Sequence, residues 1–232
     1  MVRQPQRWGG PARRAPVCGR PDGLRLGLTL APGMRVGLFG GSFNPAHDGH
    51  AHVAATAMER LRLDRLIWLV SPQNPLKSVH QTAPLAERMA SVAAFTGRRD
   101  IISDLETRLG VTYTIDTVRV LKARFPGVHF IWIMGSDNLA GFHRWRGWTD
   151  LLRAVPVAVI SRPGALLQSR LGPAARRFPH ARLPSRQGPV LARAAAPAWM
   201  FLRGPLHKAS STAIRAQTTL HPGASMGPRI GL

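Results

Sequence analysis

Apolar runs of strand length alternate with amphipathic stretches of helix length over most of the chain. The apolar runs lie at 34–39, 65–71, 128–135, 156–161 and 198–204, with a shorter run near 100–104. The clearest helical stretches between them lie at 49–62, 84–97 and 114–125. Strands separated by helices predict an α/β fold with a doubly wound, Rossmann-like parallel sheet and helices on both faces.

The length of 232 residues is enough to bury the core of one such domain. We expect the nucleotide-binding domain to occupy 34–216 and an unstructured tail to occupy 217–232. Residues 1–33 are rich in Gly, Pro and Arg, which predicts a disordered basic leader with Met34 as an alternative start. Deletion of 1–33 is therefore expected to leave the fold and the activity intact.

The chain has a single cysteine, Cys18. A disulfide within the chain and a cysteine metal site are therefore excluded, and a reducing, cytoplasmic setting fits. No run approaches the roughly 18 to 20 apolar residues that a membrane-spanning helix needs. We expect no contact with a membrane.

The formal net charge of +21 raises the possibility of a nucleic-acid-binding protein. Residues 1–33 hold six arginines and one acidic residue, and residues 161–232 hold eleven basic residues and none that is acidic. The predicted core is thus only mildly basic, and no zinc-finger spacing or aromatic RNA-binding signature occurs. A composition bias explains the charge better, and we expect no nucleic-acid partner.

The first apolar run ends in Gly40 and Gly41, within the segment GLFGGSFNPAHDGH. Ligands of parallel α/β sheets lie beyond the carboxyl ends of the strands, where helix N-termini expose backbone N–H groups. The two glycines allow close approach of a ligand, and the N–H groups of Ser42 and Phe43 can bind a phosphate. The dinucleotide fingerprint and the P-loop pattern are both absent.

Two histidines follow this turn, His47 and His50. Asp48 is a candidate cap for the next helix. If the helix begins there, His47 lies just before it and His50 lies in its first turn. Both imidazoles can then face the same anion.

These residues resemble the signature of the nucleotidylyltransferase superfamily. The resemblance rests on Gly41-Ser42-Phe43-Asn44-Pro45 with His47-Asp48-Gly49-His50, and on a second motif, Ser210-Ser211-Thr212-Ala213-Ile214-Arg215. It implies that His47 and His50 are catalytic donors to the phosphates of ATP. It also implies that Ser211 and Thr212 hold the β- and γ-phosphates while Arg215 adds a planar charge. Mg²⁺ would bridge phosphate oxygens without side-chain ligands.

Three further segments resemble the nicotinate-nucleotide adenylyltransferases: 71–77, 105–118 and 133–145. The resemblance implies transfer of the adenylyl group of ATP to nicotinate mononucleotide in NAD biosynthesis. The implied substrate-binding residues are Asn74, Lys77, Tyr113, Thr114, Gly135, Asp137, Trp145 and Arg162. Among these, Gly135 and Asp137 would bind a ribose, Trp145 would stack on the pyridine, and Tyr113 and Thr114 would lie by its carboxylate. Arg162 matches a position near the adenine.

Alternatives remain at this stage. Tyr113 and Trp145 could be core aromatics, Asp137 could cap a helix, and Asn74 and Lys77 could be solvated loop residues. The loop lacks the histidine that commonly precedes the lysine in this family, so any role of that histidine is open here. The acceptor could instead be nicotinamide mononucleotide or pantetheine phosphate, or the chain could be a nucleic-acid-binding protein on an inactive nucleotidylyltransferase fold.

Overall fold

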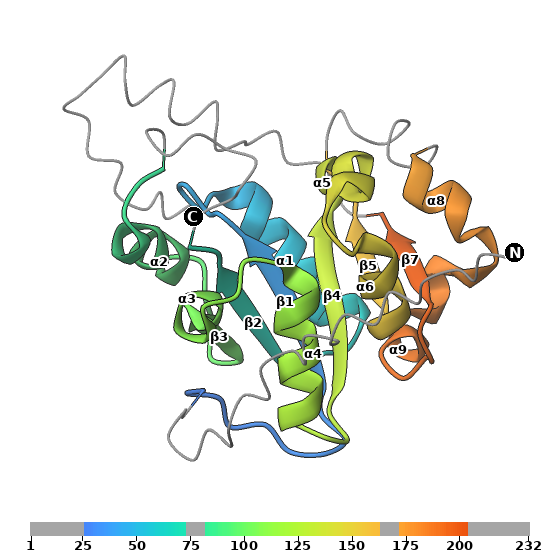
Figure 1. Ribbon diagram of the computed structural model, residues 1–232, viewed down its shortest axis with the longest axis horizontal. Coiled ribbons are helices and arrows are strands. Elements are labelled where there is room, and N and C mark those ends of the chain that lie inside the picture. The colour runs from blue at the N-terminus through green and yellow to red at the C-terminus, as the bar shows by residue number, and fades with distance from the viewer. Residues whose placement is uncertain (1–25, 73–81, 163–171, 204–232) are drawn as a thin grey trace, which may run out of the picture.

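A seven-stranded parallel sheet forms the centre of the computed structural model, which describes residues 26–72, 82–162 and 172–203 (Figure 1). The strand order is β3-β2-β1-β4-β5-β7-β6, and every neighbouring pair is parallel. The strands are β1 (Arg35–Gly41), β2 (Arg65–Val70), β3 (Asp100–Ser103), β4 (His129–Gly135), β5 (Val157–Ile160), β6 (Arg182–Leu183) and β7 (Trp199–Leu202). The predicted doubly wound parallel sheet is confirmed.

Helices cover both faces of this sheet, and α4 and α6 cross in front of the strands in Figure 1. The helices are α1 (Asp48–Arg60), α2 (Leu85–Ala93), α3 (Leu105–Leu109), α4 (Thr114–Arg124), α5 (Ser136–Gly141), α6 (Trp148–Ala154), α8 (Pro173–Arg177) and α9 (Gly188–Leu191). Short 3₁₀ helices are η2 (Phe142–Arg144), η3 (Pro179–Ala181) and η4 (Ser185–Gln187). One core cluster joins the strands to α3, α4, α5, α6 and α8, and the other joins them to α1, α2 and α9.

Apart from the first residue of β1, β2 and β4, the central strands are apolar because both of their faces are buried. In β4, Phe130, Trp132 and Met134 belong to one core cluster, and Ile131 and Ile133 belong to the other. This alternation follows from the two-residue period of a strand. A continuous apolar run was therefore a reliable signal for these strands.

The elements that the sequence did not predict are the shortest ones. The strand β6 has two residues, Arg182–Leu183, and α3 has five, Leu105–Leu109. Neither is long enough to show a period of 2 or 3.6 residues. Gly110 ends α3 with a left-handed φ of 62°, a conformation that glycine adopts without strain.

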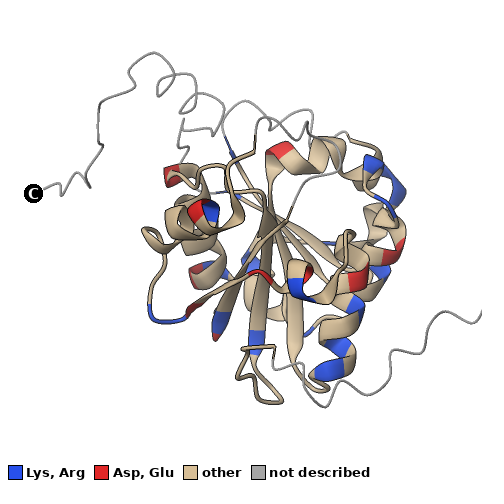
Figure 2. Cartoon of the chain, turned by 60° about the vertical axis from the view of Figure 1, so that its left-hand side comes forward, with Lys and Arg blue, Asp and Glu red and all other residues tan. Residues whose placement is uncertain are grey.

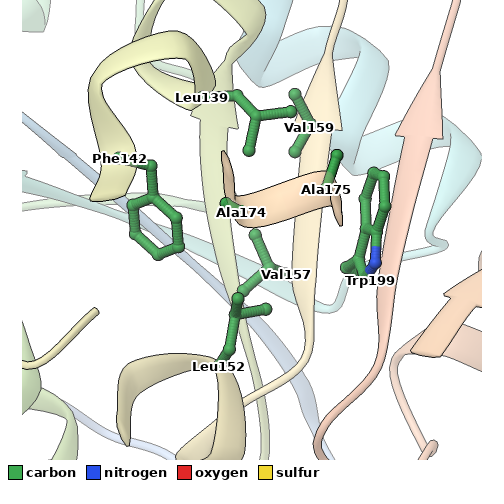
Figure 3. Close-up of a pocket in the computed structure, with 8 residues that line it drawn as sticks. All are labelled: Leu139, Phe142, Leu152, Val157, Val159, Ala174, Ala175 and Trp199. Atoms are coloured by element: carbon green, nitrogen blue, oxygen red, sulfur yellow. The ribbon is translucent and has the colours of Figure 1, made fainter. Parts of the chain in front are cut away.

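The short helix α8 covers the outer part of the sheet through two small residues (Figure 3). Ala174 and Ala175 lie over Val157, Val159 and Trp199 of β5 and β7. The contact leaves a cavity of about 10 Å³ whose lining is aliphatic and aromatic. It is a packing gap with no polar groups for a ligand.

Residues 26–33 pack against the domain. The disordered leader was expected to extend to residue 33, and the packed part of the chain instead begins by residue 26. Leu26 is 6% exposed and belongs to a core cluster, and Leu28 and Leu30 pack on the same cluster. Arg108 Nη2 also donates to the carbonyl of Leu26 at 3.1 Å. The alternation of leucines in this segment, with Thr29 exposed between them, was the signal for a half-buried extended segment.

A chain that lacks 1–33 is expected to be less stable than a chain that lacks 1–25. The longer deletion removes three leucines that contact the core, and burying one leucine stabilises a fold by about 1.5–3 kcal/mol. We expect a difference of about 2–5 kcal/mol in the free energy of unfolding, measured by urea titration. Leu26→Ala should account for much of it, and the exposed control Thr29→Ala should change little. Equal stability of the two truncated chains would contradict this assignment.

Basic and acidic residues both occur on many elements of the described part. In Figure 2 the basic residues are spread over several elements with acidic residues among them. Ion pairs join Arg35 to Asp64, Arg108 to Asp104, Arg119 to Asp116, Arg153 to Asp150 and Arg162 to Asp137. Within this part of the chain no helix is long and apolar enough to cross a bilayer.

Candidate active site

The switch point of the sheet lies between β1 and β4. From β1 the chain proceeds outward to β2 and β3, and it returns to β4 on the other side of β1. The connections therefore leave a crevice at the carboxyl ends of these two strands, which is where parallel α/β sheets bind ligands. The segments that begin there are the turn after Gly41, the helix after Gly135 and the segment after Ile160.

The turn between β1 and α1 is built on buried aromatic packing. Phe43 is 1% exposed, has a φ of 43°, and packs against Phe39 and Trp68. The core requires glycine at position 40, because a Cβ there would collide with the indole of Trp132. A Cβ at Gly41 would lie 3.0 Å from the Phe43 ring. The end of β1 is therefore packed closely against Trp132 and Phe43, and its last peptide groups lie at the crevice.

The two histidines form a reciprocal cap at the start of α1. His47 is the N-cap, and its Nδ1 accepts a hydrogen bond from the N–H of Gly49 at 3.0 Å. The N–H of His47 donates to Nδ1 of His50 at 3.3 Å. The prediction that Asp48 caps the helix was wrong, because Asp48 is the first helical residue and the imidazole of His47 takes the capping role.

This cap determines which nitrogen of each imidazole carries the proton. A backbone N–H can only donate, so Nδ1 of His47 and Nδ1 of His50 are unprotonated acceptors. In the neutral rings the proton is then on Nε2, which becomes the donor. The ring centroids are 3.9 Å apart with an angle of 38° between the planes. The helix start therefore presents two imidazole donors side by side.

His47 remains neutral at physiological pH. It is 3% exposed, and its pKa is lowered from 6.5 to about 4, chiefly because burial disfavours the charged form. The positive charge of Arg162 lowers the pKa in the same direction, whereas Asp48 and Asp137 oppose the change. His47 can therefore donate a hydrogen bond as a neutral ring and does not add a charge.

We expect this pKa to make the folded state less stable in acid. The folded pKa lies below the unfolded value of 6.5, so the unfolded chain binds the proton more readily. The contribution of His47 to stability is complete above pH 6.5 and is lost as the pH falls through about 4. The matched variant is His47→Asn, because asparagine is a good N-cap without a titrating group. Urea titrations between pH 7 and 4 should show the wild type losing stability faster than the variant, and a constant difference would contradict the shift.

Asp137 in α5 and Arg162 after β5 form an ion pair that connects these two segments at the crevice. Their side chains pair at 3.2 Å and are 48% and 14% exposed, respectively. Arg162 Nη2 also donates to the carbonyl of Gly49 in the first turn of α1 at 3.2 Å. The alternative that Asp137 caps α5 is wrong, since Gly135 is the N-cap and no side chain caps this helix.

Gly135 leaves room for this pair. A Cβ at Gly135 would collide with Oδ1 of Asp137 and would lie 3.0 Å from Nε of Arg162. Within the described residues, that buried Nε has no hydrogen-bond partner. The structure thus brings together His47, His50, Gly135, Asp137 and Arg162, which stand far apart in the sequence.

A second group of predicted residues lies at the start of α4. Tyr113 is the N-cap of α4 and Thr114 is its first residue, with no side-chain cap. The guanidinium of Arg146 lies 4.7 Å from the centroid of the Tyr113 ring. Gly147, with a φ of 67°, brings the chain against Ile115, which lies 3.1 Å from its Cβ position. The segment that contains Trp145 therefore packs on the first turn of α4.

The ring of Trp145 is half-buried. It meets Phe142 edge to face with centroids 5.3 Å apart and Trp132 with centroids 6.1 Å apart. Trp132 also fills the space above Gly40. The indole of Trp132 thus separates the turn after β1 from the segment of Trp145, and Trp145 is partly a core residue.

A buried hydrogen bond links the two ends of the segment 105–118. Thr117 Oγ1 donates to Oε1 of Glu106 at 3.3 Å. Both residues are buried, and burial raises the pKa of Glu106 to about 7. This contact joins α3 to the first turn of α4.

Five predicted residues lie outside the described residues: Asn74, Lys77, Ser211, Thr212 and Arg215. Their roles remain predictions. Sequence reasoning missed the buried Arg88, which contacts the turn after β1 through the carbonyl of Ser42 at 2.8 Å. Its signal was an arginine on the apolar face of the helix 84–97. Residues 26–72, 82–162 and 172–203 contain no cluster of three His, Cys, Asp or Glu that could hold a metal ion.

The sequence matches the cytidylyltransferase-like family over residues 38–217. A probable nicotinate-nucleotide adenylyltransferase of Caulobacter sp. (strain K31) is 69% identical over 187 residues, which cover 80% of this chain and 99% of that protein. Its counterpart in Roseobacter denitrificans is 52% identical over 196 residues, which cover 84% and 98%.

The nicotinic acid mononucleotide adenylyltransferase of Plasmodium falciparum, solved in complex with NaAD, has a similar fold. The TM-score is 0.60 at 16% identity, with coverage of 78% of this chain and 82% of that one. This likeness concerns the fold, and the high identities above carry the family assignment. The chain belongs to the cytidylyltransferase-like family, within its nicotinate-nucleotide adenylyltransferase branch.

Proposed function

We propose that this chain transfers the adenylyl group of ATP to nicotinate mononucleotide, giving nicotinic acid adenine dinucleotide and pyrophosphate in the synthesis of NAD. The observation that carries the proposal is the reciprocal cap of His47 and His50 at the switch point of the sheet. It places two imidazoles, each with Nδ1 accepting a backbone N–H, side by side at one helix start. The names of the Caulobacter and Roseobacter relatives support the choice of acceptor.

The reaction needs no nucleophilic side chain. The 5′-phosphate of the mononucleotide attacks the α-phosphorus of ATP, one P–O bond forms, and the bond to the departing pyrophosphate breaks. Negative charge grows on the α-phosphate oxygens and on the leaving group, so fixed donors lower the barrier. His47 and His50 would supply two of them, and the N–H groups of the turn Gly41–Phe43 would supply others.

The second motif would complete the phosphate site. Ser211 and Thr212 would hold the β- and γ-phosphates, and Arg215 would add a permanently charged planar fork. Gly135 and Asp137 would bind a ribose, and Arg162, paired with Asp137, would lie near the adenine. We keep 34–216 as the extent of the nucleotide-binding domain, preceded by the packed segment 26–33, and 217–232 as a tail.

The acceptor would lie beside the start of α4. Trp145 would stack on the pyridine, and the first N–H groups of α4, near Tyr113 and Thr114, would face its carboxylate. Asn74 and Lys77 would close over the nucleotide. Mg²⁺ would enter as part of the MgATP substrate. Phosphate oxygens and water are ligands that this ion prefers, so it would need few ligands from the protein. The enzyme would work in the cytoplasm.

A pyrophosphate-release assay with MgATP tests this proposal. The acceptors are nicotinate mononucleotide, nicotinamide mononucleotide and pantetheine phosphate, and release should be fastest with the first. The competing function is binding of nucleic acid by an inactive fold. Tight, steeply salt-dependent RNA or DNA binding in a filter assay, together with no pyrophosphate release, would favour that function.

A further inference from the structure

Arg88 is a buried arginine on α2, behind the turn that follows β1. The residue is 2% exposed and shares the inner face of α2 with Val92. Arginine is almost never buried to this degree unless it is paired. In the part of the chain that the structure describes, no carboxylate lies within ion-pair distance of it.

Backbone carbonyls take the place of a carboxylate. Nε donates to Ala83 at 2.9 Å, Nη1 donates to Ser42 at 2.8 Å and to Ser71 at 2.6 Å, and Nη2 donates to Pro72 at 2.8 Å. Three chain segments thus converge on one guanidinium: the turn after β1, the exit of β2 and the entry to α2. A planar group with five N–H donors can hold three segments, which a lysine amine with its single nitrogen cannot do in the same geometry.

Two further side chains join α2 to the same turn. The N–H of Ala46 donates to Oγ of Ser91 at 3.0 Å, and that hydroxyl donates to the carbonyl of Arg88 at 2.7 Å. The N–H of Ala83 donates to Oδ1 of Asn44 at 3.1 Å. The position of the turn relative to β2 is therefore set by α2.

The contact with Ser42 has a direct consequence for the N–H of Phe43. The peptide between these residues is trans and planar, so its carbonyl and its N–H point in opposite directions. An arginine that holds the carbonyl from behind also orients the N–H toward the other side. Hydrogen bonds to the two ends of a peptide polarise one another, so a cation on the carbonyl strengthens the N–H as a donor.

We propose that Arg88 is a positioning residue for adenylyl transfer: it orients and polarises the Ser42–Phe43 peptide and holds it at a set distance from the exit of β2. The inference rests on the proposed function, in which the N–H of Phe43 binds a phosphate of ATP. Arg88 thus sets the position of the turn that would bind the donor phosphates relative to the exit of β2.

The test compares Arg88→Lys and Arg88→Gln with the wild type in the pyrophosphate-release assay. The folded fraction of each protein is measured by circular dichroism at the assay temperature, and kcat is expressed per folded molecule. Misplacement by about 1 Å can cost about 10² in rate. We expect both variants to lose at least about tenfold in kcat per folded molecule, while KM for nicotinate mononucleotide changes less than about threefold.

The matched control is Arg35→Lys. Arg35 forms a similar fork to Asp64 with Nε–Oδ2 at 3.2 Å and Nη2–Oδ1 at 3.1 Å, at the opposite end of β1. Its variant should lose stability with kcat per folded molecule unchanged. A purely structural Arg88 would behave in the same way.

Each result has a defined meaning. A loss smaller than about tenfold in kcat per folded molecule in either variant overturns the inference, and so does a loss confined to KM. Failure of both variants to fold also overturns it, because Arg88 would then be a requirement of folding. A wild type that releases no pyrophosphate with ATP and nicotinate mononucleotide would instead overturn the proposed function, and this inference with it.

Discussion

The His50→Ala variant is expected to lose kcat by about 10² or more while KM for ATP changes far less. The imidazole is held by the cap so that its Nε2–H donates from the start of α1, where charge would build on the phosphates in the transition state. Removing one preorganised donor of this kind costs about 10²–10³ in kcat. The measurement is steady-state pyrophosphate release at varied ATP.

His50 also caps the helix, so two controls separate the cap from the donor. His50→Asn keeps an acceptor near the position of Nδ1 and lacks the distal N–H. This variant should be close to the wild type in stability and as low in kcat as His50→Ala. The alanine variant should also lose the cap, which costs about 0.5–2 kcal/mol in the free energy of unfolding. His180→Ala, at an exposed position, should leave kcat unchanged. An unchanged kcat in His50→Ala would remove this residue from the mechanism.

A preference for nicotinate mononucleotide over nicotinamide mononucleotide of at least about 10² in kcat/KM is the second large effect. The two acceptors differ by a carboxylate against a carboxamide. The first N–H groups of α4 have no side-chain cap, so they would be donors to the oxygens of a carboxylate. Arg146 adds a positive charge beside Tyr113, and a helix N-terminus favours an anion.

A carboxamide would direct its NH₂ group at these donors. Each buried polar group left unpaired costs about 1–3 kcal/mol, and sites built to bind one functional group can reject an analogue by about 10⁴. Stacking on Trp145 would not discriminate, since both pyridine rings present the same face. The measurement is kcat/KM for both mononucleotides on one preparation. Equal values would show that the donor set at α4 does not select the carboxylate.

The sheet could be predicted from the sequence because its strands are buried on both sides. Within 128–135 every position except His129 is apolar, and the intervening helices are long enough to show their period. The prediction failed where an element was too short, as in β6 and α3. It also failed at 26–33, where composition favoured disorder although Leu26 packs into the core.

The two histidines of the candidate site could be found for a related reason. His47 and His50 are separated by three positions and cap each other within one helical turn, so local chemistry is enough to bring them together. Asp137 and Arg162 were identified only through the family resemblance. Their pairing, and their contact with Gly49, depend on the parallel order of β1, β4 and β5.

The local pattern of this chain was sufficient to predict a doubly wound sheet and a histidine pair at a helix start, because periodicity and capping act over a few residues. It was insufficient for Arg88, whose carbonyl partners Ser42 and Ser71 stand 46 and 17 positions away. Backbone carbonyls occur at every residue and carry no sequence signal. Only the tertiary structure determines which carbonyls lie beside the guanidinium. Because an unpaired buried charge would cost several kcal/mol, the fold must place hydrogen-bond acceptors at these positions.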